Sequence, residues 1–219
     1  NVILKKDIDG IEVNLGYGGT DGPNYEETSA SIVWGTSNEK SSASVIIDYF
    51  KNTSLSSGEM GSLGTADQRA LGGEDFRSSR GFPGYFYVDG VKTIDPACPA
   101  DSATASGSCL FDYGPYGYIA PASERIGAIS QFEYNFDNGI TAFLEMAVQH
   151  NSSVAMGAPT PLDEDAGLTV PANHPNNPFG KDIDIGRYRT VDAGARQWDI
   201  ESDTMRFVAG LRGEFNDWS

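Results

Sequence analysis

A two-residue alternation of apolar and polar positions returns six times along the chain. In each stretch the apolar side chains occupy every second position, and no charged side chain falls among them. Successive side chains of a β-strand point to opposite faces, so this period predicts strands that each have one fully apolar face. The predicted strands are 11–17, 28–34, 43–49, 126–136, 140–148 and 205–211. Such faces must be buried in a protein core or in lipid.

The connections between these predicted strands are of two kinds. Short polar turns follow the second and the fourth strand, at 38–40 and 137–139. The second turn contains Asn138 and Gly139, which favour tight hairpins because both residue types tolerate a positive φ. The longest connections are expected as outer loops at about 51–124 and 151–203. Short turns at one end and long loops at the other are typical of outer-membrane β-barrels.

We therefore predict an all-β fold, an antiparallel meander of about six long strands that forms part of a transmembrane β-barrel with short periplasmic turns and long extracellular loops. Strands of about 9–11 residues can cross a bilayer core. Aromatic residues near the strand ends would form two interfacial girdles. They are Trp34, Phe132, Tyr134 and Phe136 on the short-turn side, with Tyr17 and Tyr49 on the loop side. The alternative is a half-buried sheet in a soluble β-sandwich.

Composition narrows the function classes. The chain carries a net charge of −16 with only 15 basic residues, so no basic stripe exists to neutralise the phosphates of a nucleic acid. No apolar run is long enough for a transmembrane helix, which leaves a strand-built membrane protein open because barrel strands give a weaker hydropathy signal. Both ends of the sequence suggest a piece of something longer.

The two cysteines, Cys98 and Cys109, lie in the longest predicted loop, among proline, serine, aspartate and glycine residues. An even number of cysteines in a polar segment favours a local disulfide and an oxidising compartment. Two free thiols are the alternative. A metal site is set aside because two cysteines alone lack the remaining ligands.

No catalytic constellation is found, so we expect no enzyme activity and no cofactor. His150 ends the fifth predicted strand, and His174 lies in a segment rich in Asn and Pro. No paired spacing makes His174, Asp182 and Asp184 a metal site, and no metal is expected. The acidic clusters at 163–165 and 199–203 are expected as solvated loop charge, with a surface calcium site as the alternative.

Aromatic residues gather in the longest loop. The segment 81–87 contains Phe82, Tyr85, Phe86 and Tyr87. These four residues are our candidate ligand contacts, as a stacking surface for a sugar ring, an aromatic siderophore or a similar ligand. The alternative is that they pack together, because a long loop needs a small core of its own to be ordered.

Four segments resemble those of TonB-dependent outer-membrane receptors. Residues 1–7 followed by 10–18 resemble the junction between the plug and the barrel of that family. The stretch 119–143 is similar to one of its barrel hairpins, and so are 176–180 and 204–215 to other parts of its barrel. Together they cover about half of the chain, in the order that the family has them.

The resemblance implies a barrel of about 22 strands around an N-terminal plug. Residues 1–10 would then be the end of the plug or its linker, and 11–219 the N-terminal part of the barrel. Such receptors sit in the bacterial outer membrane, bind a scarce nutrient (a siderophore, vitamin or carbohydrate) and import it. The implied partners are the nutrient, outer-membrane lipid, and the TonB system through a plug that this chain lacks. The runner-up function is a soluble surface binding or adhesion module.

Overall fold

The computed structural model describes residues 8–214, and they form antiparallel β-sheets, turns and short 3-10 helices. They divide into two compact units. The sheet unit comprises Pro121–Val154 and the described parts of Asn1–Ser54 and Asp199–Ser219, and the loop unit comprises Leu55–Ala120 and Ala155–Trp198. The prediction of an all-β fold is confirmed. None of the described helices is long and apolar enough to cross a membrane.

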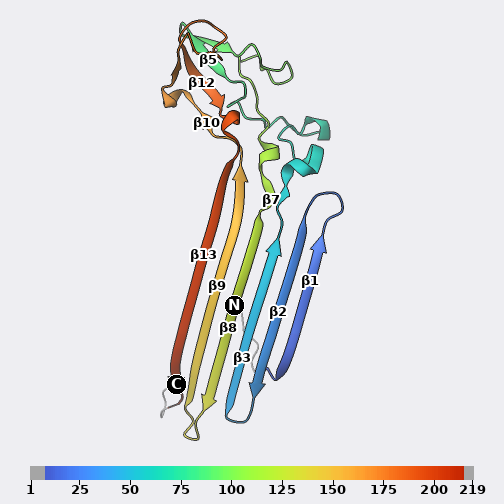
Figure 1. The fold of residues 1–219 in the computed structure, drawn as a ribbon, viewed down its shortest axis with the longest axis vertical. Helices are drawn as coiled ribbons and strands as arrows, with labels where there is room; N and C mark the ends of the chain where they lie inside the picture. Colours follow the sequence, from blue (N-terminus) through green and yellow to red (C-terminus); the bar gives the residue numbers. More distant parts are fainter. Residues whose placement is uncertain (1–7, 215–219) are drawn as a thin grey trace. The chain divides into compact units, whose positions relative to one another are not determined.

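The sheet unit is built on one six-stranded antiparallel sheet in the order β1-β2-β3-β8-β9-β13 (Figure 1). Within the described residues this sheet is open, with β1 and β13 as its two edge strands. Its strands are β1 (Gly10–Gly19), β2 (Glu26–Ser37), β3 (Ser41–Asn52), β8 (Ala122–Asn135), β9 (Thr141–Gly157) and β13 (Arg196–Arg212).

Strand register brings the predicted apolar positions together on a single face of this sheet. Val13 pairs with Ile32, Ile32 pairs with Ile47, Ile47 pairs with Ala128, and Ala128 pairs with Val148. Directly paired residues point to the same face of a sheet. One row of apolar side chains therefore crosses five strands, and we call the surface that contains this row the apolar face.

The apolar face is exposed. The exposed fraction reaches 81% at Leu15 and 83% at Met205, on the two edge strands. In the interior strands it is 45% at Ile47 and 50% at Ile126. Side chains of this size usually lie inside a soluble domain, so the exposure of the whole face requires an explanation.

The opposite face, which we call the polar face, carries ion pairs. Arg206 lies 2.6 Å from Glu145, and Arg212 lies 2.5 Å from Glu133. Arg125 extends over the ring of Phe50, with its guanidinium carbon 4.5 Å from the ring centroid. The two faces of one sheet thus have different chemistry, as the alternation predicted.

The two predicted short turns are also observed. The Oδ1 atom of Asn38 accepts hydrogen bonds from the backbone N–H groups of Lys40 and Ser41, both at 2.9 Å. Gly139 closes the other turn at a φ of +82°, in the left-handed region that favours glycine. Lys40 and Asp137 form an ion pair of 2.7 Å between the two turns.

The last two strands of the sheet extend beyond the apolar alternation. β9 continues to Gly157 and β13 begins at Arg196, so the connection between them is 158–195, shorter than the expected 151–203. Both strands carry polar residues there on both faces, and the hydrogen-bond ladder continues where the hydropathy pattern stops. Residues 1–7, assigned above to the plug or its linker, lie outside the described residues, and so do 215–219.

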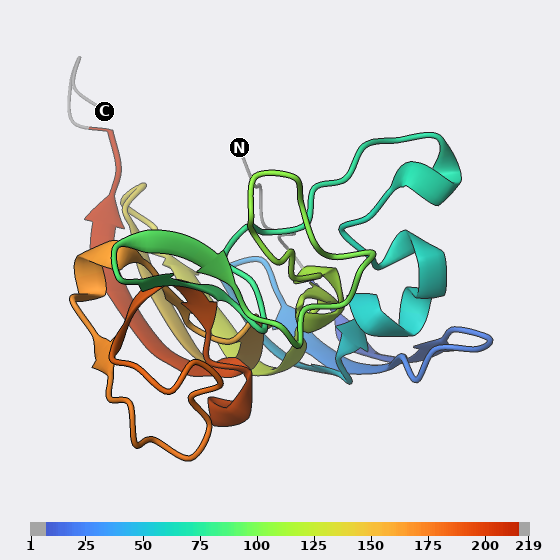
Figure 2. The ribbon, with the colours of Figure 1, turned by 90° about the horizontal axis from the view of Figure 1, so that it is seen from above.

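The loop unit contains two small sheets. One has five strands in the order β10-β12-β5-β6, with β11 paired to β12, and the other pairs β4 with β7. The 3-10 helices η1 and η2 lie apart from the β10–β12 segment (Figure 2). The strands are β4 (Leu55–Ser56), β5 (Tyr85–Val88), β6 (Val91–Ile94), β7 (Tyr118–Ala120), β10 (Pro161–Leu162), β11 (Thr169–Val170) and β12 (Ile183–Arg189). The helices are η1 (Ser57–Leu63), η2 (Arg69–Leu71), η3 (Gly114–Tyr116), η4 (Glu164–Ala166) and η5 (Val191–Ala193).

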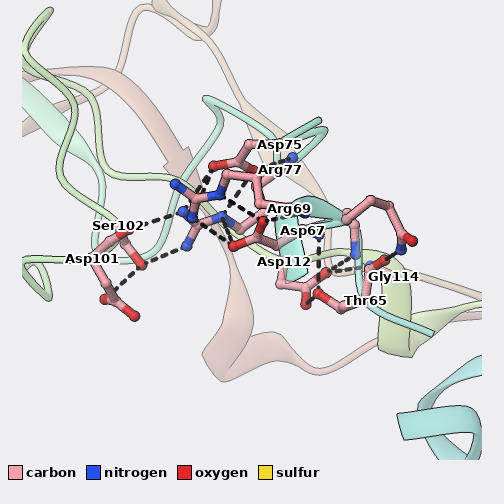
Figure 3. A network of polar contacts seen from close by, with 11 residues as sticks. Thr65, Asp67, Arg69, Asp75, Arg77, Asp101, Ser102, Asp112 and Gly114 are labelled. Atoms are coloured by element: carbon pink, nitrogen blue, oxygen red, sulfur yellow. Dashed lines mark hydrogen bonds and ion pairs between the residues drawn. The ribbon is translucent and has the colours of Figure 1, made fainter. Parts of the chain in front are cut away.

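An ionic network fixes the segment after η2 (Figure 3). The side chain of Arg77 is only 8% exposed and lies 2.9 Å from Asp75. It also donates to the backbone carbonyl of Asp101 at 2.9 Å. Arg69 pairs with Asp67 at 2.6 Å, and this contact lowers the pKa of Asp67 to about 2. Ion pairs thus hold in place a segment that has few apolar side chains.

Arg189 is a second basic residue of the loop unit with little exposure. It is 5% exposed and donates to the carbonyl oxygens of Arg80 and Pro159, both at 2.9 Å. It also donates to Ser78 Oγ at 3.1 Å, and its guanidinium carbon lies 4.9 Å from the centroid of the Phe111 ring. Burial lowers its pKa. One guanidinium therefore connects segments that are far apart in the sequence.

Candidate functional site: an aromatic cavity in the loop unit

The end of the predicted aromatic segment lies in β5, where the alternation directs its side chains to the two faces of the five-stranded sheet. Tyr85 and Tyr87 point to one face, with ring centroids 6.1 Å apart, and Phe86 points to the other. The neighbouring strand β12 has a bulge at Gly186. A Cβ atom there would come within 2.2 Å of the Tyr85 ring, so only glycine lets this ring lie against the strand.

The tyrosine face is a network of internal contacts. The hydroxyl groups of Tyr85 and Tyr87 donate to Glu164 Oε1 at 3.1 and 2.9 Å. Burial raises the pKa of Tyr85, and the hydrogen bond to Glu164 raises that of Tyr87. Lys92 Nζ lies 4.1 Å from the centroid of the Tyr85 ring. Tyr85 is 4% exposed, so on this face it serves packing.

The Phe86 face forms the floor of a cavity of about 630 Å³, within the range of about 300–1,000 Å³ that is usual for small-molecule sites. The ring of Tyr188 lies 5.8 Å from that of Phe82, edge to face, and 6.4 Å from that of Phe86. Ile183 and Ile185 of β12 also contribute to the apolar lining. We call this space the aromatic cavity.

Polar residues line the same cavity. Asp95 follows β6 and Asp192 lies in η5, and both lie near Tyr188, whose pKa is raised by burial and then by these two carboxylates. His174 and Asn176 come from the connection between β11 and β12. No Lys or Arg is found among the described residues that line the cavity. The aromatic cavity therefore combines ring faces with negative charge.

The connection between β11 and β12 is held in place by Asn177. Its Nδ2 atom donates to the carbonyl oxygens of Pro171 at 3.0 Å and Lys181 at 2.8 Å. Its Oδ1 atom accepts from the backbone N–H of Phe179 at 2.9 Å. The cavity wall is thus ordered by contacts within the chain itself.

The predicted ligand contacts are divided by the structure. Phe82 and Phe86 line the aromatic cavity, whereas Tyr85 and Tyr87 belong to the opposite face. Sequence reasoning missed Tyr188, which lies far along the chain in β12. The apolar spacing of Ile183 and Ile185 was an available sign of a strand there, although the bulge shifts the pattern before Tyr188.

The predicted disulfide is confirmed. Cys98 and Cys109 are bonded, with their Cα atoms 5.9 Å apart and a sequence separation of 11. The bridge closes a small excursion of the loop unit. Lys92 Nζ reaches into this excursion and donates to the carbonyl oxygen of Ser106 at 2.9 Å.

Other chemistry-bearing residues have structural partners. His150 Nδ1 lies 2.7 Å from Asp203 in the sheet unit. Asp163, from the first acidic cluster, pairs with Arg80 at 2.6 Å and with Arg187 at 3.3 Å. Among residues 8–214, no group of His, Cys, Asp and Glu side chains is arranged to hold a metal ion.

No protein family model, curated protein or solved structure matches the chain. What the protein does must therefore follow from its own features. Two of them call for an explanation: the aromatic cavity, and the contrast between the two faces of the six-stranded sheet.

Proposed function

We propose that this chain is part of a TonB-dependent receptor of the bacterial outer membrane, which binds a scarce nutrient at the cell surface and imports it. The nutrient would be a siderophore, a vitamin or a carbohydrate. The observation that carries the proposal is the exposed apolar face of the six-stranded sheet. An antiparallel sheet with an uncharged apolar band on one face and charged side chains on the other fits the wall of a barrel, with lipid outside and water inside.

The dimensions of the apolar face suit a bilayer. Its apolar positions run from Ile126 in β8 to Phe136, directly after the end of that strand, about 33 Å at roughly 3.3 Å per residue. Tilted strands then give a band close to the approximately 25 Å of outer-membrane barrels. On the same face the band ends in two polar contacts, the ion pair of Lys51 with Glu124 at 3.0 Å and the contact of His150 Nδ1 with Asp203 at 2.7 Å. A lipid boundary accounts for this abrupt change.

The polar face suits the inside of a barrel. Its ion pairs, Arg206 with Glu145 and Arg212 with Glu133, would line an aqueous lumen. The segment before β1 also approaches this face, since a Cβ atom at Gly35 would come within 2.5 Å of the carbonyl oxygen of Ile8. A chain arriving on the lumen side supports a plug that precedes the barrel and connects it to TonB.

The edges of the sheet make a further demand. Within the described residues, β1 and β13 each have one neighbour only. Unpaired backbone groups are too costly in hydrocarbon, so spanning sheets close into barrels. The proposal therefore requires additional strands beside β1 and β13. A soluble β-sandwich would instead need a second layer over side chains such as Leu15 and Met205, which are highly exposed.

Membrane fractionation tests the proposal. In the native cell, we expect the polypeptide that contains this sequence to stay in the outer-membrane pellet after an alkaline carbonate wash and to require detergent for extraction. It should also be several times longer than 219 residues. Its deletion should remove a TonB-dependent uptake activity. Release of the protein by carbonate without detergent would contradict the membrane assignment.

A further inference from the structure

The aromatic cavity carries a more specific inference, which rests on the proposed function. We propose that it binds an organic cation, a ligand with an ammonium group on a small apolar body. Three aromatic rings supply apolar walls, and two carboxylates supply negative charge without a basic partner in the lining. A cavity with this combination should bind a cation more tightly than an anion or a neutral ligand of the same shape.

The rings provide the first half of the site. Phe82 and Tyr188 meet edge to face at 5.8 Å, so their faces are turned in different directions around the space. The face of an aromatic ring attracts a cation within about 6 Å of its centroid, most strongly where water is excluded. Phe86, which is 6% exposed, keeps the floor of the cavity apolar. An alkylated ammonium group satisfies both demands.

The carboxylates provide the second half. One oxygen of Asp95 accepts from the backbone N–H of Ala97 at 2.8 Å, which fixes its position and leaves its second oxygen available. Asp192 makes no side-chain hydrogen bond or ion pair within the described part of the chain. Both carboxylates lie close enough to Tyr188 to raise its pKa.

The opposite face of the same small sheet makes the contrast clear. There Asp163 is neutralised by Arg80 and Arg187, and Glu164 is occupied by two tyrosine hydroxyl groups. Asp163 and Glu164 thus have partners on that face, whereas Asp95 and Asp192 form no ion pair with a described residue beside the aromatic cavity. An anionic ligand would be repelled from the cavity by Asp95 and Asp192. A cationic ligand would be attracted by both carboxylates.

Binding should be measured by calorimetry on the full chain in nonionic polyoxyethylene micelles, with choline and its uncharged isostere 3,3-dimethyl-1-butanol as probes. We expect choline to bind at least about tenfold more tightly than the isostere, because the two have the same shape and differ in charge. Added salt should weaken choline binding. Equal affinity for the two probes, or binding of maltose in preference to choline, would overturn the inference.

Variants locate the effect. Asp192→Asn should weaken choline about fivefold and leave the isostere unchanged, since it removes charge from an exposed residue without changing its size. Tyr188→Leu should abolish preference for the cation. Asp165→Asn, an exposed carboxylate on the opposite face, is the matched control and should bind choline normally. A loss in Asp165→Asn equal to that in Asp192→Asn would refute the site. Because membrane extraction is measured separately, failure here leaves the receptor proposal standing.

Discussion

The sheet unit and the loop unit are both antiparallel β-structure, yet they are stabilised differently. The six strands of the sheet unit have 10 to 17 residues and continuous pairing. The strands of the loop unit have two to seven residues. Buried apolar side chains occur in the loop unit alone among the described residues, and they are Ala66, Tyr85, Phe86, Cys109, Ala158, Pro159 and Ile183.

This difference shows where each unit obtains its stability. Among the described residues, the sheet unit has a backbone ladder but no apolar interior, and its apolar face is left exposed. The loop unit has its own small interior, reinforced by a disulfide, ion pairs and a buried guanidinium. The same secondary structure can thus form an exposed apolar surface, which we propose faces lipid, and a compact body with an interior of its own.

The largest expected effect comes from placing a charge on the apolar face. Leu144 pairs with Phe132 near the middle of the apolar band. Leu144→Arg should cost about 2–4 kcal/mol of membrane stability and prevent insertion, as measured by the fraction of protein left in the carbonate-washed pellet. The neighbouring change Glu145→Gln lies on the polar face and removes an exposed ion pair with Arg206, so insertion should be nearly normal. Insertion of Leu144→Arg at the wild-type level would contradict the lipid assignment.

A second test addresses the interior of the loop unit. Arg189→Met should destabilise it by about 2–4 kcal/mol, because the carbonyl groups of Arg80 and Pro159 lose buried donors. Thermal unfolding followed by near-ultraviolet circular dichroism measures this loss. Arg212→Met removes an exposed pair with Glu133 and should cost less than about 1 kcal/mol. Equal losses of stability in Arg189→Met and Arg212→Met would contradict the view that a buried guanidinium stabilises the loop unit more than an exposed ion pair stabilises the sheet unit.

The disulfide offers a third, smaller effect that is confined to the loop unit. Replacing Cys98 and Cys109 together by serine should cost about 2–3 kcal/mol, the value expected for closing a loop of this length. Hydrogen exchange should increase across 98–110 and stay unchanged in β3 and β8. Increased exchange in those two strands would mean that the disulfide stabilises the sheet unit as well.

The contrast between the units also explains what the sequence revealed. A sheet with one apolar and one polar face has a strict two-residue period, so the six strands and their common face were predictable from positions such as Ile32 and Ile47. The turn at Gly139 had a local signal as well. The barrel itself stays a prediction, because closure depends on strands beyond the described residues.

The loop unit was predictable only where its contacts are local. Cys98 and Cys109 are close in sequence, and their pairing was expected. Strands of two residues, such as β10 and β11, carry no period. Contacts such as Tyr85 with Glu164 and Arg189 with Arg80 join residues far apart in the chain. For the same reason the sequence could offer Phe82 and Phe86 as candidate ligand contacts, whereas only the structure places Tyr188 beside them.

Acid should produce the smallest effect, limited to the ionic network after η2. The contact with Arg69 holds the pKa of Asp67 at about 2, below its usual 3.8, and Arg77 lowers that of Asp75. A carboxylate with a lowered pKa contributes stability that is fully present above its unfolded pKa and is lost as the pH falls through the folded one. The contribution should therefore decline between about pH 4 and pH 2.

Thermal unfolding of the loop unit at pH 5, 3 and 2 should show this decline in the parent and a weaker one in Asp67→Asn. Glu74→Gln, which removes a carboxylate without an ion pair in the described part of the chain, should behave like the parent. An identical decline in Asp67→Asn would show that other carboxylates control the acid response, and that charge pairing contributes less to the loop unit than its buried residues do.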